Sequence, residues 1–295
     1  ISAAGLINAI DVAGKKLEDA RIVVNGAGAA AISCTRLYCS FGARKENIVM
    51  LDSRGVIRVD RENLTEQKRE FATTRDIHTL EEAVKDADVF VGLSKGNVLS
   101  KDMVRSMAKN PIIFALANPV PEISYEDAKD ARPDVLMSTG RTDYPNQINN
   151  VIGFPYIFRG ALDTAAKAIN EEMKLAAARA IADLARRPVP DIVNRAYHVR
   201  NFTFGPDYFI PKPVDPRLIT EVSMAVAKAA IESGVARKVI TDWKAYRQQL
   251  RELMGQESKL TQNLYDTARL SPRRVVFAEG THPTMLEAAI RAKEE

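Results

Sequence analysis

An apolar run, a glycine turn and then a helical stretch constrain this chain more than any other feature. The run is Arg21–Val24, the turn is Gly26-Ala27-Gly28-Ala29-Ala30-Ala31, and a helical pattern follows to about residue 41. Gly26 permits a tight strand-to-helix turn, Gly28 allows a phosphate to approach the backbone, and the small Ala31 allows close helix–strand packing. This order predicts the first strand–helix unit of a parallel sheet.

Further strand-like runs alternate with helical stretches through the first half of the chain. They are Asn47–Leu51, Asp88–Gly92, Pro111–Ala115 and Asp134–Met137. The runs are apolar throughout rather than alternating, as expected for parallel strands that helices cover on both faces. We therefore predict an α/β fold, a Rossmann-type doubly wound parallel sheet, followed by a helical C-terminal extension.

The second half of the chain has mainly helical periodicity. Helical patterns cover Ala161–Arg187, Pro216–Gly234 and Thr241–Leu270, and the Pro-rich segment Phe204–Pro216 is predicted to be an ordered loop. Together with the strand pattern, they predict a Rossmann-type domain at 1–160 that carries the glycine turn, a helical extension with the Pro-rich loop at 161–270, and the start of another domain at 271–295.

Both ends of the chain read as interior sequence. Ser2–Ile10 has the composition of a mid-helix segment without a cap, and Arg273–Gly280 resembles a strand that opens a new unit. We therefore expect that both ends were cut from something larger.

Composition excludes several classes of partner. The chain has 295 residues, 27% of them charged, and its net charge of +4 is spread without basic blocks, so no nucleic-acid partner is expected. No apolar run reaches the roughly 18–20 residues of a membrane span. Cys34 and Cys39 lie in one predicted helix without disulfide or metal spacing, which favours a reducing, cytoplasmic setting. The histidines, His78, His198 and His282, are predicted to be structural or surface residues.

Asp52 follows the second predicted strand, 24 positions after Gly28. An acid about 20 residues beyond such a turn hydrogen-bonds the adenine ribose in NAD-binding sheets. Ser53 and Arg54 come next and could hold a 2′-phosphate, and Arg58 could add positive charge, which favours NADP. The pattern predicts a dinucleotide site, whereas an Asp that merely opens a turn is the simpler alternative. The choice between NAD and NADP stays open.

Polar segments follow three predicted strands, at the edge where parallel sheets bind ligands. They are Ser94-Lys95-Gly96-Asn97, Leu116–Glu122 with Asn118, and Tyr144–Asn150 with Asn149 and Asn150. Neutral amides can bind a carboxylate or a carboxamide. The alternative is that these residues only form turns and helix caps.

Four segments together resemble bacterial malic enzymes: Asn25–Ala30, Gly92–Leu99, Ala115–Pro119 and Pro145–Pro155. The resemblance spans about residues 1 to 260. Phe204–Tyr208 through Pro216–Leu218 resembles the longer bacterial form, which carries a C-terminal phosphotransacetylase-like domain, and the residues from Ser271 resemble the start of that domain.

This resemblance implies oxidative decarboxylation of malate to pyruvate and carbon dioxide, with NADP or NAD, Mg²⁺ or Mn²⁺ and a homo-oligomer. By the same resemblance, Asn118, Asn149 and Asn150 lie at the substrate or the nicotinamide. The dinucleotide is held by Gly26, Ala27, Gly28, Ala29, Ala30, Asp52, Ser53, Arg54, Ser94 and Asn118.

The resemblance also places the Tyr and Lys acid/base pair and the metal-binding carboxylates upstream of this chain. We therefore expect no catalytic or metal-binding residue here, and a chain that binds cofactor but turns over little malate alone. The alternatives are another NAD(P)-dependent dehydrogenase, such as an amino-acid or tetrahydrofolate dehydrogenase, and a non-catalytic nucleotide-binding module.

Overall fold

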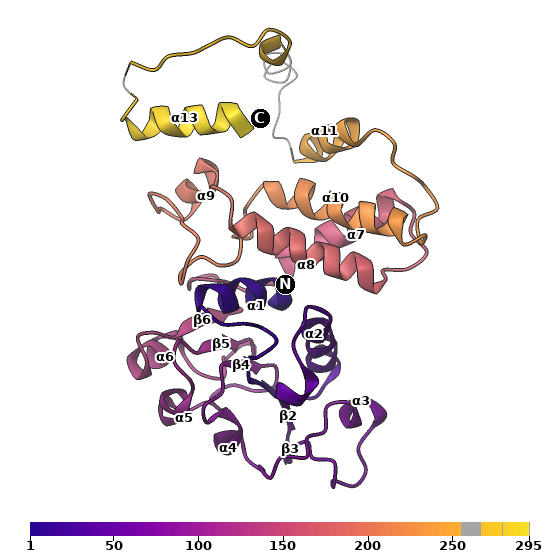
Figure 1. Cartoon of the computed structure of the whole chain (residues 1–295), viewed down its shortest axis with the longest axis vertical. Helices are drawn as coiled ribbons and strands as arrows, with labels where there is room; N and C mark the ends of the chain where they lie inside the picture. Colours follow the sequence, from indigo (N-terminus) through magenta and orange to yellow (C-terminus); the bar gives the residue numbers. More distant parts are fainter. Residues whose placement is uncertain (255–266, 279, 295) are drawn as a thin grey trace. The chain divides into compact units, whose positions relative to one another are not determined.

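The computed structural model describes residues 1–254, 267–278 and 280–294, which form two compact units. Unit 1 is Ile1–Thr241 and contains the whole described sheet, and unit 2 is Asp242–Glu295 (Figure 1). The predicted domain boundaries at residues 160 and 270 stay predictions.

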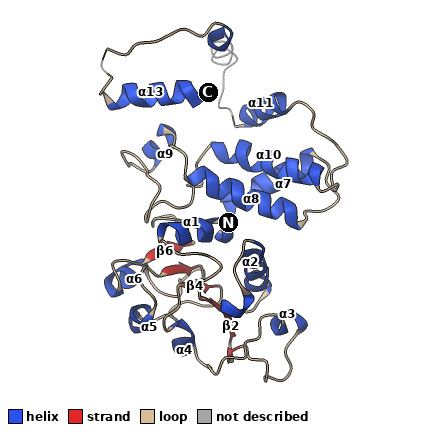
Figure 2. Cartoon of the chain, in the orientation of Figure 1, coloured by secondary structure: helices blue, strands red, loops and turns tan. Residues whose placement is uncertain are grey.

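Unit 1 contains a six-stranded sheet, whose strands are drawn in red in Figure 2. Its strands are β1 (Ile22–Asn25), β2 (Ile48–Asp52), β3 (Gly55–Val56), β4 (Val89–Gly92), β5 (Ile112–Ala115) and β6 (Leu136–Thr139). Their order across the sheet is β3-β2-β1-β4-β5-β6. Every pair is parallel except β2 and the short β3. The strand order reverses between β1 and β4, where doubly wound sheets open a ligand crevice at their carboxyl ends. The predicted Rossmann-type sheet is confirmed.

Helices form much of the remaining described chain. Those of the sheet-bearing part are α1 (Ser2–Val12), α2 (Ala29–Ser40), α3 (Glu66–Arg69), α4 (Leu80–Val84), α5 (Lys101–Ser106) and α6 (Tyr125–Ala131). Unit 1 continues with α7 (Phe154–Asp163), α8 (Glu171–Ala185), α9 (Asp191–Ala196) and α10 (Arg217–Glu232), and unit 2 contains α11 (Trp243–Leu253) and α13 (Pro283–Glu294).

Both faces of the sheet are buried, as the apolar strands predict. Alternate residues of a strand point to opposite faces. Val24 and Phe114 join an apolar cluster with residues of α1, α2, α8 and α10, whereas Val23 and Ile113 join a second cluster with residues of α4, α5 and α6. Neither face has room for a large ligand, so the edge of the sheet is left for binding.

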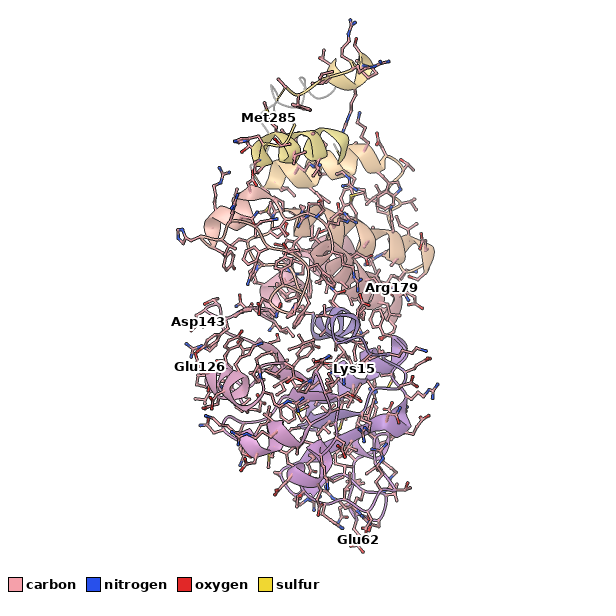
Figure 3. All side chains as sticks on the ribbon, turned by 60° about the vertical axis from the view of Figure 1, so that its left-hand side comes forward. Lys15, Glu62, Glu126, Asp143, Arg179 and Met285 are labelled. Carbon is pink, nitrogen blue, oxygen red and sulfur yellow. The ribbon has the colours of Figure 1, made fainter. Side chains whose placement is uncertain are left out.

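The first helix joins the sheet to the helical part of unit 1. Asn8 is fully buried, and its side-chain amide donates to the carbonyls of Ala182 at 2.8 Å and Phe209 at 2.9 Å. The hydrogen bonds of the buried Asn8 amide fix α1 against both α8 and the Pro-rich loop. A further contact joins α2 to α8, because the guanidinium of Arg179, labelled in Figure 3, lies 5.6 Å from the ring centroid of Phe41.

The helix predicted over Ala161–Arg187 is interrupted in the structure. α7 ends at Asp163 and α8 begins at Glu171, and Ala165 between them has a left-handed φ of 46°. The side chain of Asn170 accepts a hydrogen bond from the Met173 N–H at 3.1 Å and so caps α8. An N-cap bond of this kind satisfies a helix end and favours a new helix over a continued one.

The C-terminal predictions have different outcomes. The helix predicted over Pro216–Gly234 is confirmed as α10. Of the helix predicted over Thr241–Leu270, α11 forms Trp243–Leu253, and residues 255–266 lie outside the described residues. The prediction of a strand over Arg273–Gly280 is wrong, because residues 273–278 and 280 do not form a strand. Residue 279 lies outside the described residues. A strand needs a hydrogen-bonded partner, and the described part of unit 2 contains no other strand.

Across the described ranges, none of the helices combines the length and apolar character needed to span a bilayer.

Candidate functional site

The glycine turn has the backbone geometry that its sequence predicts. Gly26 has a φ of +133°, and an added Cβ would lie 2.7 Å from the carbonyl oxygen of Leu93. Only glycine adopts this conformation at so close an approach. Gly28 is different, because its φ is −82° and an added Cβ would meet nothing within 4 Å. Gly26 is therefore required by the fold, whereas Gly28 faces open space.

The start of α2 is open for an anion. Gly28 is the N-cap and makes no side-chain capping bond, and the first turn of this 12-residue helix contains no acidic residue. Gly28, Ala29 and Ala30 are exposed, whereas Ala31 is 1% exposed and packs against the sheet. The unpaired N–H groups and the helix dipole favour a phosphate here.

Asp52 ends β2 and anchors a charged cluster, which we call the charged corner: Asp52, Arg54, Arg61 and Lys68. The two guanidinium nitrogens of Arg61 donate to the two Asp52 oxygens at 3.1 and 3.0 Å, and Lys68 Nζ donates at 2.8 Å. The backbone N–H of Arg54 adds a bond of 3.0 Å. The Asp52 side chain is only 8% exposed, so these donors occupy most of its surface.

The charged corner carries more positive than negative charge. Burial raises the pKa of Asp52, but hydrogen bonds from Arg61 and Lys68 outweigh that effect and hold the pKa well below its usual range. Asp52 is therefore ionised, and it balances one of its two cationic neighbours. The remaining positive charge suits an added phosphate better than a pair of neutral hydroxyls.

The other residues predicted beside Asp52 are placed differently. Ser53 and Arg54 are exposed, and within the described ranges the Arg54 side chain has no hydrogen bond or ion pair. Arg58 instead pairs with Asp60 at 3.0 Å and Asp76 at 2.7 Å. Arg54 is thus available to a ligand, whereas Arg58 stabilises its own loop.

The loops after β4 and β5 carry Ser94 and Asn118. The Ser94 hydroxyl accepts a hydrogen bond from Asn25 Nδ2 at 3.0 Å, which connects it to the residue before the glycine turn. Asn118 is exposed and precedes Pro119 through a cis peptide bond. Both side chains therefore lie at the carboxyl edge of the sheet, close to the strand-order reversal.

The loop after β6 uses its asparagines in two ways. Asn146 is 2% exposed and accepts the Phe209 N–H at 2.8 Å, so it supports the ordered Pro-rich loop. Asn149 accepts the Val151 N–H at 3.0 Å and caps the short 3-10 helix Asn150–Ile152, while Asn150 is exposed. Asn149 therefore caps a helix, as the alternative interpretation predicted, and its amide nitrogen can still donate a hydrogen bond to a ligand.

The remaining reactive side chains form no site in the described residues. Cys34 and Cys39 are free thiols on α2, and His78, His198 and His282 are exposed. Among the described residues, no group of three or more His, Cys, Asp or Glu side chains is placed to hold a metal ion.

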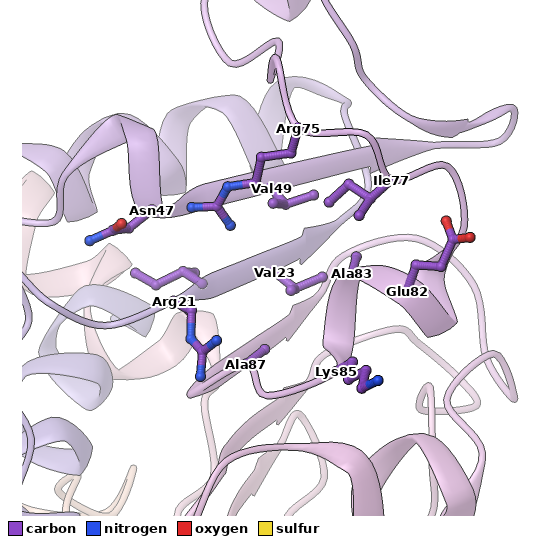
Figure 4. A pocket seen from close by; sticks show the side chains of 11 residues that line it. Arg21, Val23, Asn47, Val49, Arg75, Ile77, Glu82, Ala83, Lys85 and Ala87 are labelled. Carbon is purple, nitrogen blue, oxygen red and sulfur yellow. The ribbon is translucent and has the colours of Figure 1, made fainter.

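A pocket of about 180 Å³ lies at the opposite edge of the sheet (Figure 4). Its polar lining is Arg21, Asn47, Arg75, Glu82 and Lys85, around the amino ends of β1, β2 and β4. Doubly wound sheets bind ligands at the carboxyl ends of their strands. We therefore place the candidate site at the glycine turn and not in this pocket.

Sequence reasoning missed three residues of the carboxyl edge. Arg61 and Lys68 surround Asp52, and the buried Glu122 bonds to the Ser94 and Ala117 N–H groups. Arg61 and Lys68 lie 9 and 16 positions beyond Asp52, beyond the reach of any local motif. The buried position of Glu122 has no signal in its neighbouring sequence.

Residues 1–195 match the sequence family described as malic enzyme, NAD binding domain. The chain is 52% identical over 291 residues to the NADP-dependent malic enzyme of Rhizobium meliloti, covering 98% of this chain and 38% of that protein. It is 47% identical over 297 residues to the NAD-dependent malic enzyme of the same organism, covering 100% and 39%.

A crystal structure of Entamoeba histolytica malic enzyme superposes with a TM-score of 0.74 at 33% identity, covering 98% of this chain and 58% of that one. The malic enzyme of Pyrococcus horikoshii gives a TM-score of 0.73 at 34% identity, covering 86% and 57%. The chain spans 38% of the length of the first curated relative that it matches.

Proposed function

This chain belongs to the malic enzyme family, and we propose that it provides the cofactor-binding part of an enzyme that oxidises and decarboxylates malate to pyruvate and carbon dioxide with NADP⁺. The proposal extends to this chain the activity that its relatives' names describe. The observation that supports NADP⁺ as the cofactor is the charged corner at the end of β2.

The charged corner supports NADP over NAD. In an NAD site the acid after β2 is free to bind the ribose hydroxyls. Here Arg61 and Lys68 already hold the Asp52 carboxylate, and Arg54 lies exposed beside it. A 2′-phosphate would bring the negative charge that this cluster lacks, and charge-assisted bonds to phosphate are among the stronger hydrogen bonds in proteins. The adjacent Ser53 hydroxyl is a further donor.

The remaining cofactor-binding residues follow from their positions. The Gly26–Ala30 turn and the α2 N–H groups would hold the pyrophosphate, because Gly28 faces open space and the helix start is uncapped. Ser94 and Asn118, on the loops after β4 and β5, would contact the nicotinamide half. Asn118, Asn149 and Asn150 would hydrogen-bond malate or the carboxamide through neutral amides. When bound, the dinucleotide supplies the hydride acceptor.

The acid/base and metal chemistry is not assigned to this chain. The described residues offer no metal-holding group of His, Cys, Asp and Glu side chains, so no step is assigned to a metal here. We infer that the chain alone binds dinucleotide and turns over little or no malate. A divalent metal, a homo-oligomer and a cytoplasmic location stay predictions for the whole protein.

The proposed function is tested by titrating this chain with NADP⁺ and NAD⁺ in a calorimeter, beside a malate-oxidation assay of the whole protein with Mn²⁺. We expect NADP⁺ to bind more tightly than NAD⁺, and the whole protein to release pyruvate while reducing NADP⁺. If the whole protein oxidises a different substrate and not malate, another dehydrogenase function replaces this proposal.

A further inference from the structure

We propose that Glu122 is a positioning residue, which fixes the loops after β4 and β5 against the glycine turn and so shapes the nicotinamide half of the cofactor site. The inference rests on the proposed function, because it assumes that these loops bind the dinucleotide. Glu122 is fully buried, so it would act through these loops and not by touching the dinucleotide itself.

Glu122 is a carboxylate inside the protein rather than on its surface. The residue is 0% exposed. Its Oε2 accepts the Ala117 N–H at 3.0 Å, and its Oε1 accepts the Ser94 N–H at 3.4 Å. Within the described part of the chain it has no ion pair, so backbone N–H groups alone balance it. Burial raises the pKa of this carboxyl, and the backbone donors oppose that effect.

The surrounding backbone is built to admit the carboxyl group. Gly92 is the last residue of β4, and an added Cβ there would overlap the carboxyl carbon of Glu122. The loops also pair directly, because the Leu99 N–H donates to the Glu122 carbonyl and the Asn97 N–H to that of Pro121, both at 3.0 Å. A glycine at position 92 thus leaves the space that the buried acid occupies.

One path connects this acid to three of the four predicted cofactor-binding segments, all except Asp52–Arg54. Glu122 bonds to Ser94, the Ser94 hydroxyl accepts from Asn25 at 3.0 Å, and Asn25 directly precedes the glycine turn. On its other side Glu122 bonds to Ala117, which directly precedes Asn118. A single side chain therefore sets the spacing between the glycine turn, Ser94 and Asn118.

The arrangement needs two acceptor atoms, and only a carboxylate offers both. A glutamine at position 122 would place its NH₂ group against one of the two backbone N–H donors. A buried donor that loses its acceptor is destabilised by about 1–3 kcal/mol unless its loop moves. We expect the Ser94 or Ala117 loop to move, because its outer surface is exposed.

The two nucleotide halves of the cofactor allow a sharp test. In a doubly wound sheet one nucleotide half binds at the strands on one side of the order reversal, here β1 and β2, and the other half binds at the strands on the other side, here β4–β6. 2′,5′-ADP contains only the adenosine half of NADP⁺ with its phosphates, so we expect it to contact only the charged corner and the glycine turn. NADP⁺ should contact the loops of Ser94 and Asn118 as well.

The experiment compares NADP⁺ and 2′,5′-ADP affinities of the wild-type chain, Glu122→Gln and the control Asp134→Asn by calorimetry. Asp134 is another hydrogen-bonded acid, which pairs with Arg132 at 2.7 Å and bonds to the Asn110 N–H before β5, at the amino edge of the sheet. For Glu122→Gln we expect NADP⁺ affinity to fall about tenfold and 2′,5′-ADP affinity to change less than about twofold. The control should change neither. A general folding defect would instead lower the stoichiometry for both ligands.

The inference is wrong if Glu122→Gln keeps its NADP⁺ affinity, or if it loses affinity equally for both ligands. In either case the proposed function still holds, provided that the wild-type chain binds NADP⁺. If the wild-type chain binds neither ligand, the proposed function fails and the inference with it. Should Glu122→Gln not fold, Glu122→Asp gives the same comparison, because it keeps the charge and shortens the reach. A loss confined to NADP⁺ supports the inference, and wild-type affinity for both ligands contradicts it.

Discussion

The glycine turn and the charged corner lie at the ends of neighbouring strands, yet they are built in different ways. The turn consists of contiguous backbone, in which Gly26 packs against the Leu93 carbonyl and Gly28 faces open space. The corner consists of side chains that converge on Asp52 from as far as Lys68. The turn can bind the pyrophosphate of any dinucleotide, whereas the corner can distinguish the two cofactors by charge.

This difference separates affinity from selectivity. A change in the turn should affect NADP⁺ and NAD⁺ alike, because both carry the same pyrophosphate. A change in the corner should affect mainly the cofactor with the 2′-phosphate.

Gly26→Ala should have the largest effect. The added methyl group meets the Leu93 carbonyl oxygen at 2.7 Å, and φ is +133°. We expect the free energy of unfolding to fall by about 3 kcal/mol and the binding of both dinucleotides to be lost. Urea denaturation followed by circular dichroism measures the first effect. A wild-type denaturation midpoint would show that the turn tolerates a side chain.

Lys68→Met should reverse the selectivity of the corner. The methionine keeps most of the side-chain length and removes a charge that lies 2.8 Å from Asp52. We expect NADP⁺ affinity to fall about 30-fold, equivalent to about 2 kcal/mol. NAD⁺ affinity should be kept, because NAD⁺ has no 2′-phosphate and Arg61 still holds the Asp52 carboxylate.

The matched control is Lys101→Met, which removes another lysine that pairs with two carboxylates, those of Asp127 and Asp130 at 2.9 Å, but on α5. Its affinities for both cofactors should equal those of the wild type. Equal losses of affinity for NADP⁺ and NAD⁺ in Lys68→Met would show that Lys68 does not distinguish the two cofactors.

Asp52→Asn should affect stability in a pH-dependent way. The pKa of Asp52 is lower in the folded chain than its usual value of about 3.9, so its ionised form stabilises the fold above that pH, and the stabilisation is lost as pH falls through the folded pKa. With a discount for solvent screening, we expect about 1.5 kcal/mol between pH 5 and 8. Denaturation of both proteins from pH 3 to 8 checks this. A difference that does not shrink below about pH 4 would contradict the ionised role.

Gly28→Ala should have the smallest effect on stability and a clear effect on binding. Its φ of −82° suits alanine, and a Cβ would meet nothing within 4 Å. We expect the free energy of unfolding to change by less than about 1 kcal/mol, and the affinities for NADP⁺ and NAD⁺ to fall together by about tenfold as the methyl group enters the phosphate space. A loss that differs between the two cofactors would show that the turn also contributes to cofactor selectivity.

The sequence predicts those parts of the fold that local interactions determine. Apolar runs such as Val23–Val24 identify the strands, and Gly26 identifies the turn, because strand burial and a positive φ each restrict the residue type at that position. The interruption between α7 and α8 has a local signal too, since Asn170 is followed by two glutamates in the first turn of a capped helix.

The charged corner could not be predicted in the same way. Lys68 lies on α3, a four-residue helix that Thr65 caps, and tertiary folding alone brings it to Asp52. The burial of Glu122 likewise depends on Gly92, 30 positions earlier, because only the folded loops bring the two together. Side chains that meet across loops leave no periodic pattern in a single sequence.

The most direct test of the account is a calorimetric titration of the wild-type chain with NADP⁺ and with NAD⁺ at low and at physiological salt. We expect NADP⁺ to bind at least about tenfold more tightly, with a difference that shrinks as salt rises, because the charged corner recognises the 2′-phosphate by charge. Equal affinities, or tighter binding of NAD⁺, would contradict the role assigned to Arg54, Arg61 and Lys68.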